Sequence, residues 1–256
     1  MKIRIIAKRK YPELKKLYDS FEVSGEAEIC LAVGGDGTFI KAAKMHNGPV
    51  LPINGLDPMS VSYYSDLTIK DIDFIIESLK EKRYRVDSIS KKLEVAYNGR
   101  KYYAVNEALL HNIKESLRFS IYQIVEGRRQ RLYPYIMVGD GVIISNLVGS
   151  TAYNRAAGGP ILLNKDDMSI TFVNPDGPYR NSIVIDGHTK LEIEIMRYTG
   201  MLRYDGINIG AIKPGKKFTV SLSNKNINII KFPKRYESFE HKLEKIVSSR
   251  LVKELR

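Results

Sequence analysis

The sequence predicts a protein of two units. These are an α/β unit with a Rossmann-like parallel sheet over residues 1–85, and an all-β unit of two packed sheets over residues 86–235. Strand and helix patterns alternate through the first third of the chain, which favours a parallel sheet covered by helices. From about Tyr84 onward, short strand patterns follow one another, often between turn signals, which favours the all-β unit. A length of 256 residues suits one large domain or two small ones.

The first unit is expected to contain three strands and three helices. The strands are the apolar runs Lys2–Ala7, Ile29–Val33 and Val50–Ile53, of which the second is continuously apolar, as in a strand covered on both faces. The helices are Pro12–Ser20, which proline opens, Thr38–Asn47, which a glycine follows, and Asp71–Arg83, which has acids in its first turn and bases in its last.

The second unit is expected to consist mainly of strands. They are predicted at Val86–Ala96, Tyr102–Leu110, Phe119–Val125, Leu132–Val138, Val142–Ser145, Ser169–Val173, Leu191–Met196, Ile207–Ile212, Lys217–Leu222 and Ile227–Lys231. One short helix is predicted over Ser150–Ala157. The tail, residues 236–256, has an apolar stripe at helical spacing and is expected to form an amphipathic helix that packs back on the first unit.

Composition narrows the class of protein. No apolar run approaches the roughly 18 residues of a membrane span, and the N-terminal apolar stretch is too short for a signal peptide, so a cytoplasmic protein without a membrane partner is expected. The net charge of +12 attracts anions, which leaves nucleic acid, nucleotides and polyphosphates as candidate partners. The single cysteine, Cys30, lies in an apolar run and is expected to be buried.

The segment AVGGDGTFI contains the first candidate site. Gly34, Gly35 and Thr38 are expected to form a phosphate loop, because glycines between a buried strand and a helix let backbone N–H groups approach an anion. The loop matches neither the P-loop nor the dinucleotide fingerprint. The carboxylate of Asp36 would serve there as a general base or hold a magnesium ion. The alternative is a tight turn in which Asp36 caps the helix.

Two further segments carry polar residues in apolar surroundings. Asn106 and Glu107 interrupt a strand-like run and indicate either a site or an edge strand. Residues 139–160 join a glycine- and hydroxyl-rich loop to a short helix, where Tyr153 offers a ring for a base to stack on; the alternative is a capped helix between strands. The basic run at Arg128, Arg129 and Arg131 could neutralise phosphates or form a solvated face.

Taken in order, these motifs resemble those of the NAD kinase family. The matches are GGDGT at 34–38, Asn106-Glu107 and GSTAYN at 149–154 with its trailing GGP, supported by Asp140-Gly141 and Asp205-Gly206. The resemblance covers roughly Ile29 to Ile212. It implies an NAD kinase-like fold and the transfer of a phosphoryl group from ATP or polyphosphate to the adenosine ribose 2′-hydroxyl of NAD, giving NADP. It also implies a divalent metal, Mg²⁺, whose protein ligands are unknown.

The resemblance also assigns roles by position. Asp36 corresponds to the catalytic base and, with Gly37, to an NAD-contacting loop, whereas Asn106 and Glu107 correspond to contacts with the adenosine part of NAD. The nucleotide pocket is implied to be lined by Thr151, Ala152, Tyr153, Asn154, Arg155 and Ala156. Asp140 corresponds to a contact made across a subunit interface, which implies a homo-oligomer, a dimer or tetramer.

Four departures from the family pattern leave the choice of donor, and of NAD against NADH, open. Met59–Tyr64 replaces an apolar segment, Ser145-Asn146-Leu147-Val148 replaces Ser-Thr-Pro, Pro178-Tyr179 replaces Pro-His, and Ile207 stands where many members have Gln.

Two rival functions remain. A lipid kinase shares the GGDG loop but would present an apolar, membrane-facing surface. A nucleic-acid binder would cluster basic residues with exposed aromatics. Neither is favoured, and no nucleic-acid partner is expected.

Overall fold

A computed structural model describes residues 1–57, 62–178 and 180–233. The described residues divide into two compact units, one formed by Met1–Ser88 with residues 228–233, the other by Ile89–Ile227. The helix predicted over residues 236–256 lies outside the described residues. None of the helices in the described ranges is long and apolar enough to cross a membrane.

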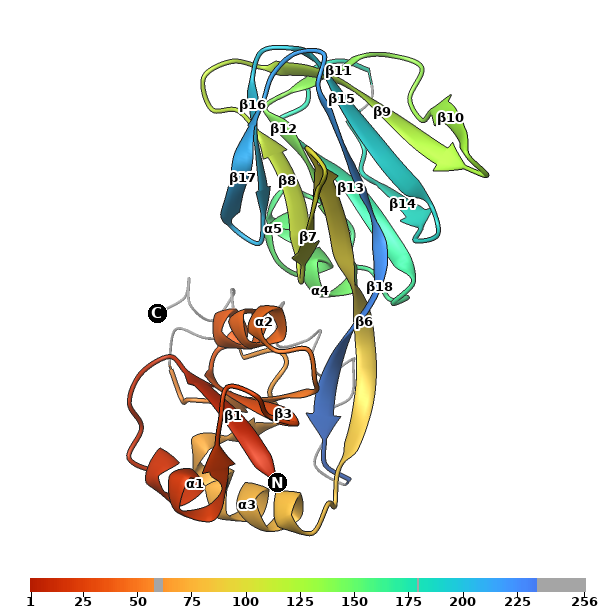
Figure 1. The fold of residues 1–256 in the computed structure, drawn as a ribbon. Helices are drawn as coiled ribbons and strands as arrows, with labels where there is room; N and C mark the ends of the chain where they lie inside the picture. The colour runs from red at the N-terminus through yellow and green to blue at the C-terminus, as the bar shows by residue number, and fades with distance from the viewer. Residues whose placement is uncertain (58–61, 179, 234–256) are drawn as a thin grey trace. The chain divides into compact units, whose positions relative to one another are not determined.

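The first unit is built on a parallel sheet (Figure 1). Its strand order is β18-β4-β3-β1-β2, with β5 also paired to β4. The strands are β1 (Lys2–Ala7), β2 (Glu22–Val23), β3 (Ile29–Gly34), β4 (Val50–Asn54), β5 (Leu67–Thr68) and the end of β18 (Lys217–Lys231). The helices are α1 (Leu14–Ser20), α2 (Asp36–Met45) and α3 (Ile72–Lys80), the last preceded by a 3₁₀ turn at Ile69–Asp71.

The strand order places a topological switch point between β1 and β3. The chain leaves β1 toward β2 on one side, and later proceeds from β3 to β4 on the other. Ligands of open parallel sheets bind beyond the carboxyl ends of the strands at such a point. All six residues of β3 are buried, which confirms the predicted two-sided cover of this strand. Cys30 in β3 is fully buried as expected, and burial raises the pKa of its thiol to about 11.

The second unit consists of two sheets. One has the order β14-β13-β12-β8-β16-β17. In the other, β15 lies between β9 and β18 and pairs with both, β10 and β11 pair with β9, and β6 pairs with β7 and β18. The strands are β6 (Arg85–Tyr97), β7 (Arg100–Ala104), β8 (Glu107–His111), β9 (Leu117–Val125), β10 (Arg128–Arg131), β11 (Met137–Gly139), β12 (Gly141–Ser145), β13 (Asp167–Val173), β14 (Ile183–Asp186), β15 (Lys190–Arg197), β16 (Gly200–Tyr204) and β17 (Ile207–Ile212).

One apolar core joins the two sheets of the second unit. Phe119 and Ile121 on β9 and Ile193 on β15 belong to the same buried cluster as Leu110 on β8 and Ile144 on β12. Their strands alternate inward and outward side chains, so each sheet turns one apolar face toward the other. The predicted all-β architecture of two packed sheets is therefore confirmed.

Three predictions of strands in the second unit need correction. The strand predicted at Tyr102–Leu110 is two strands, β7 and β8, because the chain turns at Val105 and Asn106. The strand predicted at Leu132–Val138 is wrong except for its last two residues, since Pro134 has no N–H to donate to a ladder. The strands predicted at Lys217–Leu222 and Ile227–Lys231 are one continuous strand, β18, without glycine or proline to interrupt it.

Candidate functional site

The glycine loop connects β3 to α2 at the switch point of the first unit. The helix begins at Asp36, two residues earlier than predicted, and its N-cap is Gly35, which has no side chain to cap it. Thr38 therefore lies in the first turn of the helix. A Cβ at Gly34 would lie 2.3 Å from Thr38 Oγ1, so this tight entry into the helix requires glycine.

Asp36 is held by a segment on the other side of the loop. Its Oδ1 accepts a hydrogen bond of 3.2 Å from the backbone N–H of Tyr64. The ring of Tyr64 stacks on Phe39 of α2 with the ring centroids 4.7 Å apart, and Tyr63 packs edge-on against Tyr64 at 4.9 Å. Because Asp36 is bound from another segment and Gly35 is the N-cap, the alternative of Asp36 as a helix cap is excluded.

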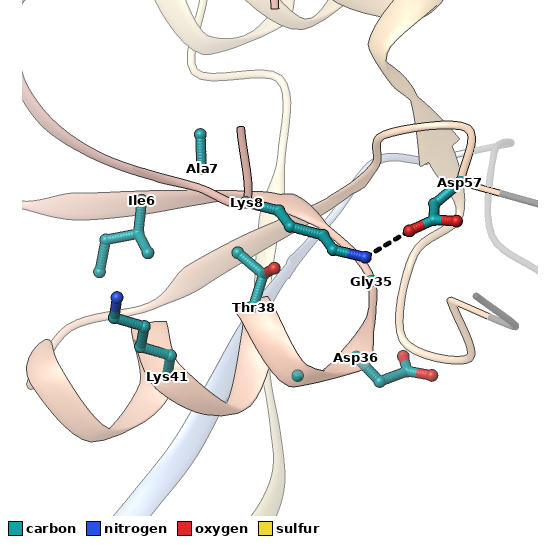
Figure 2. Close-up of a pocket in the computed structure, with 9 residues that line it drawn as sticks. Ile6, Ala7, Lys8, Gly35, Asp36, Thr38, Lys41 and Asp57 are labelled. Carbon is teal, nitrogen blue, oxygen red and sulfur yellow. Dashed lines mark hydrogen bonds and ion pairs between the residues drawn. The ribbon is translucent and has the colours of Figure 1, made fainter. Parts of the chain in front are cut away.

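An open pocket of about 480 Å³ lies beside this loop. It is lined by the end of β1, the first turns of α2 and Asp57, and Figure 2 shows the Asp36 carboxylate pointing away from Lys41. Lys8, which follows β1, forms an ion pair with Asp57, and Lys41 projects from α2 (Figure 2). The two lysines and the helix N-terminus supply positive charge on which phosphate groups can bind, although Asp36 and Asp57 in the same lining balance the formal charges of the lysines.

The pocket carboxylates suit a magnesium ion that arrives with phosphates. Among the described residues, no group of three or more His, Cys, Asp or Glu side chains could hold a metal by itself. Magnesium is commonly held by one or two carboxylates together with substrate phosphates and water. Asp36 and Asp57, both lining the pocket, are carboxylates of this kind.

The second group of candidate residues surrounds the turn between β7 and β8. Glu107 is only 8% exposed, and the Oδ1 atom of Asn106 is buried without a hydrogen-bond partner among the described residues. A buried amide oxygen without a partner is costly in a folded protein. A ligand that donates a hydrogen bond here would remove that cost.

The Gly149–Asn154 segment contacts this turn. A Cβ at Gly149 would lie 2.0 Å from the carbonyl oxygen of Asn106, so only glycine permits the approach. The predicted single helix Ser150–Ala157 is two short helices, α4 (Leu147–Ser150) and α5 (Tyr153–Ala156), separated by Thr151 and Ala152. The side chain of Asn146 caps α4 by accepting the N–H of Gly149 at 2.9 Å.

Asn154 differs from its neighbours in being fully buried. Its amide nitrogen donates to the carbonyls of Ser150 and Pro160, and its Oδ1 accepts from the hydroxyls of Ser169 and Thr171. This side chain is saturated by the protein and holds the loop in place. By contrast, Tyr153 and Ala156 are exposed, while Thr151, Ala152 and Arg155 are half-buried.

Asp140 lies apart from the other candidates of the second unit. It precedes β12, whose opposite end pairs Ser145 with Glu107. The intervening five-residue strand is roughly 14 Å long, so Asp140 does not join the Asn106–Glu107 cluster within one chain. Its carboxylate accepts a hydrogen bond of 3.1 Å from Asn174.

Sequence reasoning missed several residues of these sites. Lys8, Lys41 and Asp57 line the pocket of the first unit, and no motif singled them out. Lys8 directly follows the strand predicted at Lys2–Ala7, which is the signal that could have placed it at the sheet's carboxyl edge. Among the arginines, Arg129 pairs with Glu192 and Glu194 and covers the ring of Tyr122, so it belongs to a network within its own sheet.

The matching family model and the similar proteins are all described as NAD kinases. The family model of the ATP-NAD kinase C-terminal domain matches residues 128–232. The chain is 26% identical over 229 residues to the NAD kinase of Sulfurimonas denitrificans, covering 88% of this chain and 79% of that protein. It is 28% identical over 240 residues to the NAD kinase of Thermoplasma volcanium, covering 86% and 84%.

Solved structures share the fold at low identity. Yeast NADH kinase, solved with NADH, superposes with a TM-score of 0.80 and 16% identity over 97% of this chain and 87% of that one. An NAD kinase from Archaeoglobus fulgidus, solved with ATP, gives a TM-score of 0.73 and 16% identity over 96% and 99%.

Proposed function

Because the chain belongs to the NAD kinase family, we propose that it transfers a phosphoryl group to the 2′-hydroxyl of the adenosine ribose of NAD, giving NADP. The donor is ATP or inorganic polyphosphate. Family membership makes the protein a phosphotransferase. The observation that carries the proposal is the position of Asp36, at the carboxyl edge of β3 beside a pocket lined by Lys8 and Lys41.

Asp36 acts as the general base. A ribose hydroxyl is a poor nucleophile at neutral pH, and a positioned base accelerates such a step by about 10²–10⁴. As the hydroxyl oxygen forms its bond to phosphorus, its proton passes to the Asp36 carboxylate, and the bond to ADP or to the shortened polyphosphate breaks. The Tyr64 N–H, 3.2 Å from Asp36 Oδ1, fixes the direction of the carboxylate.

The pocket of the first unit receives the donor phosphates. Lys8 and Lys41 supply positive charge for them, and the backbone of Gly35 and Gly37, which line the pocket, allows close approach, while Gly34 allows the tight turn before them. Magnesium would be held by Asp57 with the phosphate oxygens, and it would neutralise charge on the transferred group. Burial, and then the negative charge of Asp36, raise the pKa of Tyr63, so its phenol stays protonated beside the base.

The second unit recognises the nucleotide. Asn106 and Glu107 bind the adenosine part, which is supported by the buried Oδ1 of Asn106, since it has no hydrogen-bond partner in the part of the chain that the structure describes. Thr151, Ala152, Tyr153, Arg155 and Ala156 line the pocket with exposed or half-buried side chains, and Asn154 contributes through its backbone. The separation of Asp140 from this cluster supports a homo-oligomer, a dimer or tetramer, in which Asp140 serves the site of a partner subunit.

The test is NADP formation from NAD with magnesium and either ATP or polyphosphate, read by an NADP-specific cycling assay. Omission of magnesium and the use of 2′-deoxy-NAD, which lacks the acceptor hydroxyl, serve as controls. NADP from NAD but no phosphorylated product from the deoxy analogue is expected. Absence of NADP with both donors, or phosphorylation of the deoxy analogue, would contradict the proposal.

A further inference from the structure

The backbone N–H groups of the turn at Val105–Glu107 donate to an acceptor that lies outside the strand ladders flanking the turn. The carboxylate of Asp205 accepts three backbone N–H groups, those of Val105 at 2.8 Å, Asn106 at 2.7 Å and Glu107 at 3.3 Å. Backbone groups that leave a sheet must find other partners when they are buried. One carboxylate provides these partners for three consecutive residues.

Asp205 is itself fixed in place. It occupies the hairpin between β16 and β17 with a φ of +43°, followed by Gly206 at +78°, and its own N–H donates to the carbonyl of Glu107 at 3.1 Å. Two positive φ values in succession are typical of the tight turns that join twisted strands. The carboxylate therefore meets the Val105–Glu107 turn from a rigid support about 100 residues away in sequence.

Asn146 binds carbonyl groups of the same turn. Its amide nitrogen donates to the carbonyls of Val105 at 3.0 Å and Lys91 at 2.7 Å, and its backbone N–H reaches the carbonyl of Asn106 at 3.4 Å. The side chain is fully buried, and its Oδ1 accepts the N–H of Gly149. A threonine at this position could accept from Gly149, but its single hydroxyl hydrogen could not serve two carbonyls.

We propose that Asp205 and Asn146 are positioning residues that together hold Asn106 and Glu107 in the geometry that recognises the nucleotide. Asp205 accepts hydrogen bonds from the N–H groups of the turn, and Asn146 donates a hydrogen bond to its carbonyl group. The side chain of Asn106 is thereby left for a ligand, and its buried Oδ1 has no partner among the described residues. This inference rests on the proposed function, because it assigns the ligand as NAD.

The first test compares Asp205→Asn and Asn146→Thr with the wild type. Asp205→Asn keeps the shape of the side chain but replaces one of the two acceptor oxygens with an NH2 group, so at least one backbone N–H of the turn loses its acceptor. For both variants, the Kd and KM for NAD should rise about tenfold, and the KM for ATP should change by less than about twofold. Hydrogen exchange of the amides at 105–107 should accelerate without ligand. The control is Asp186→Asn, another turn carboxylate that accepts a backbone N–H, that of His188 at 2.7 Å, and it should leave both KM values unchanged.

The results of these measurements distinguish the positioning role of Asp205 and Asn146 from the proposed function. Faster exchange at 105–107 with an unchanged Kd for NAD in both variants would overturn the positioning role while the proposed function stands. A fall in melting temperature with equal loss of NAD and ATP affinity would also overturn it, because a purely structural role predicts that result. A wild type that binds no NAD would overturn the proposed function, and this inference with it. If Asp205→Asn fails to fold, Asn146→Thr decides alone.

Discussion

Substituting Gly149 with alanine tests the close contact between the GSTAYN segment and the Asn106 turn. A Cβ at this position would lie 2.0 Å from the Asn106 carbonyl oxygen and 2.5 Å from its carbon, whereas real Cβ contacts under 3.0 Å essentially never occur. The two segments must therefore separate by about 1 Å. Overpacking typically costs about 1–3 kcal/mol, and the atoms met here belong to backbone that hydrogen bonds hold in place.

Helix propensity opposes part of this cost. Gly149 lies in α4, where alanine is favoured over glycine by up to about 1 kcal/mol. We expect a net loss of about 2 kcal/mol in the free energy of unfolding, or roughly 4–8 °C in melting temperature. The displaced turn should also weaken NAD binding about tenfold, because Asn106 moves with it.

The assay pairs thermal unfolding with calorimetric titration of NAD. Gly25→Ala is the matched control, since its Cβ would meet no atom within 4 Å. It should change stability by less than about 0.5 kcal/mol and leave the Kd unchanged. Wild-type stability and wild-type NAD affinity in Gly149→Ala would refute the steric reasoning.

Three other predictions concern the packing of each unit. Lys231→Met removes the ion-pair partner of the Asp66 carboxylate, and both side chains are 10% exposed or less, so the free energy of unfolding should fall by about 3–5 kcal/mol. Adding Asp66→Leu should recover most of this loss, as measured by chemical denaturation, and no recovery would contradict the pairing. Glu192 is held by two cations: burial acts to raise its pKa, but hydrogen bonds from Lys217 and Arg129 prevail and hold the pKa below its ordinary value. Its contribution is present above the unfolded pKa of about 4.3 and is lost as pH falls through the lower, folded pKa. Glu192→Gln should therefore destabilise by about 1–2 kcal/mol at pH 7 and approach the wild type in melts at a pH below the folded pKa; a difference independent of pH would count against this. Cys30, fully buried with its pKa raised to about 11, should react with a thiol reagent at pH 8 only after unfolding, and rapid labelling of the native protein would contradict its burial.

The sequence predicted what depends on local pattern. The buried strand Ile29–Gly34 and the glycine turn after it are encoded by neighbouring residues, and both lie where the pattern placed them, with the helix start displaced by two residues. Asp36 stands out in sequence because a carboxylate among glycines conflicts with phosphate binding.

What the sequence did not predict depends on distant partners. The turn at Val105–Asn106 exists because Asp205 accepts its N–H groups, and no local signal reveals a partner about 100 residues away. Asn154 looked like a ligand contact in a polar motif, yet hydroxyls from β13 saturate its side chain. Lys8 follows β1 and Asp57 follows β4, and they meet in one pocket only because these two strands flank β3 in the sheet.

The most direct test of the central claim is the rate of NADP formation by Asp36→Asn. Asparagine keeps the size of the side chain and can still accept the Tyr64 N–H, but it cannot take a proton. The account predicts that kcat falls by about 10²–10⁴ while the Kd for NAD changes by less than about twofold. Asp73→Asn, which alters a carboxylate that is 75% exposed, should leave both unchanged. An Asp36→Asn variant that makes NADP at the wild-type rate would contradict the assignment of Asp36 as the base.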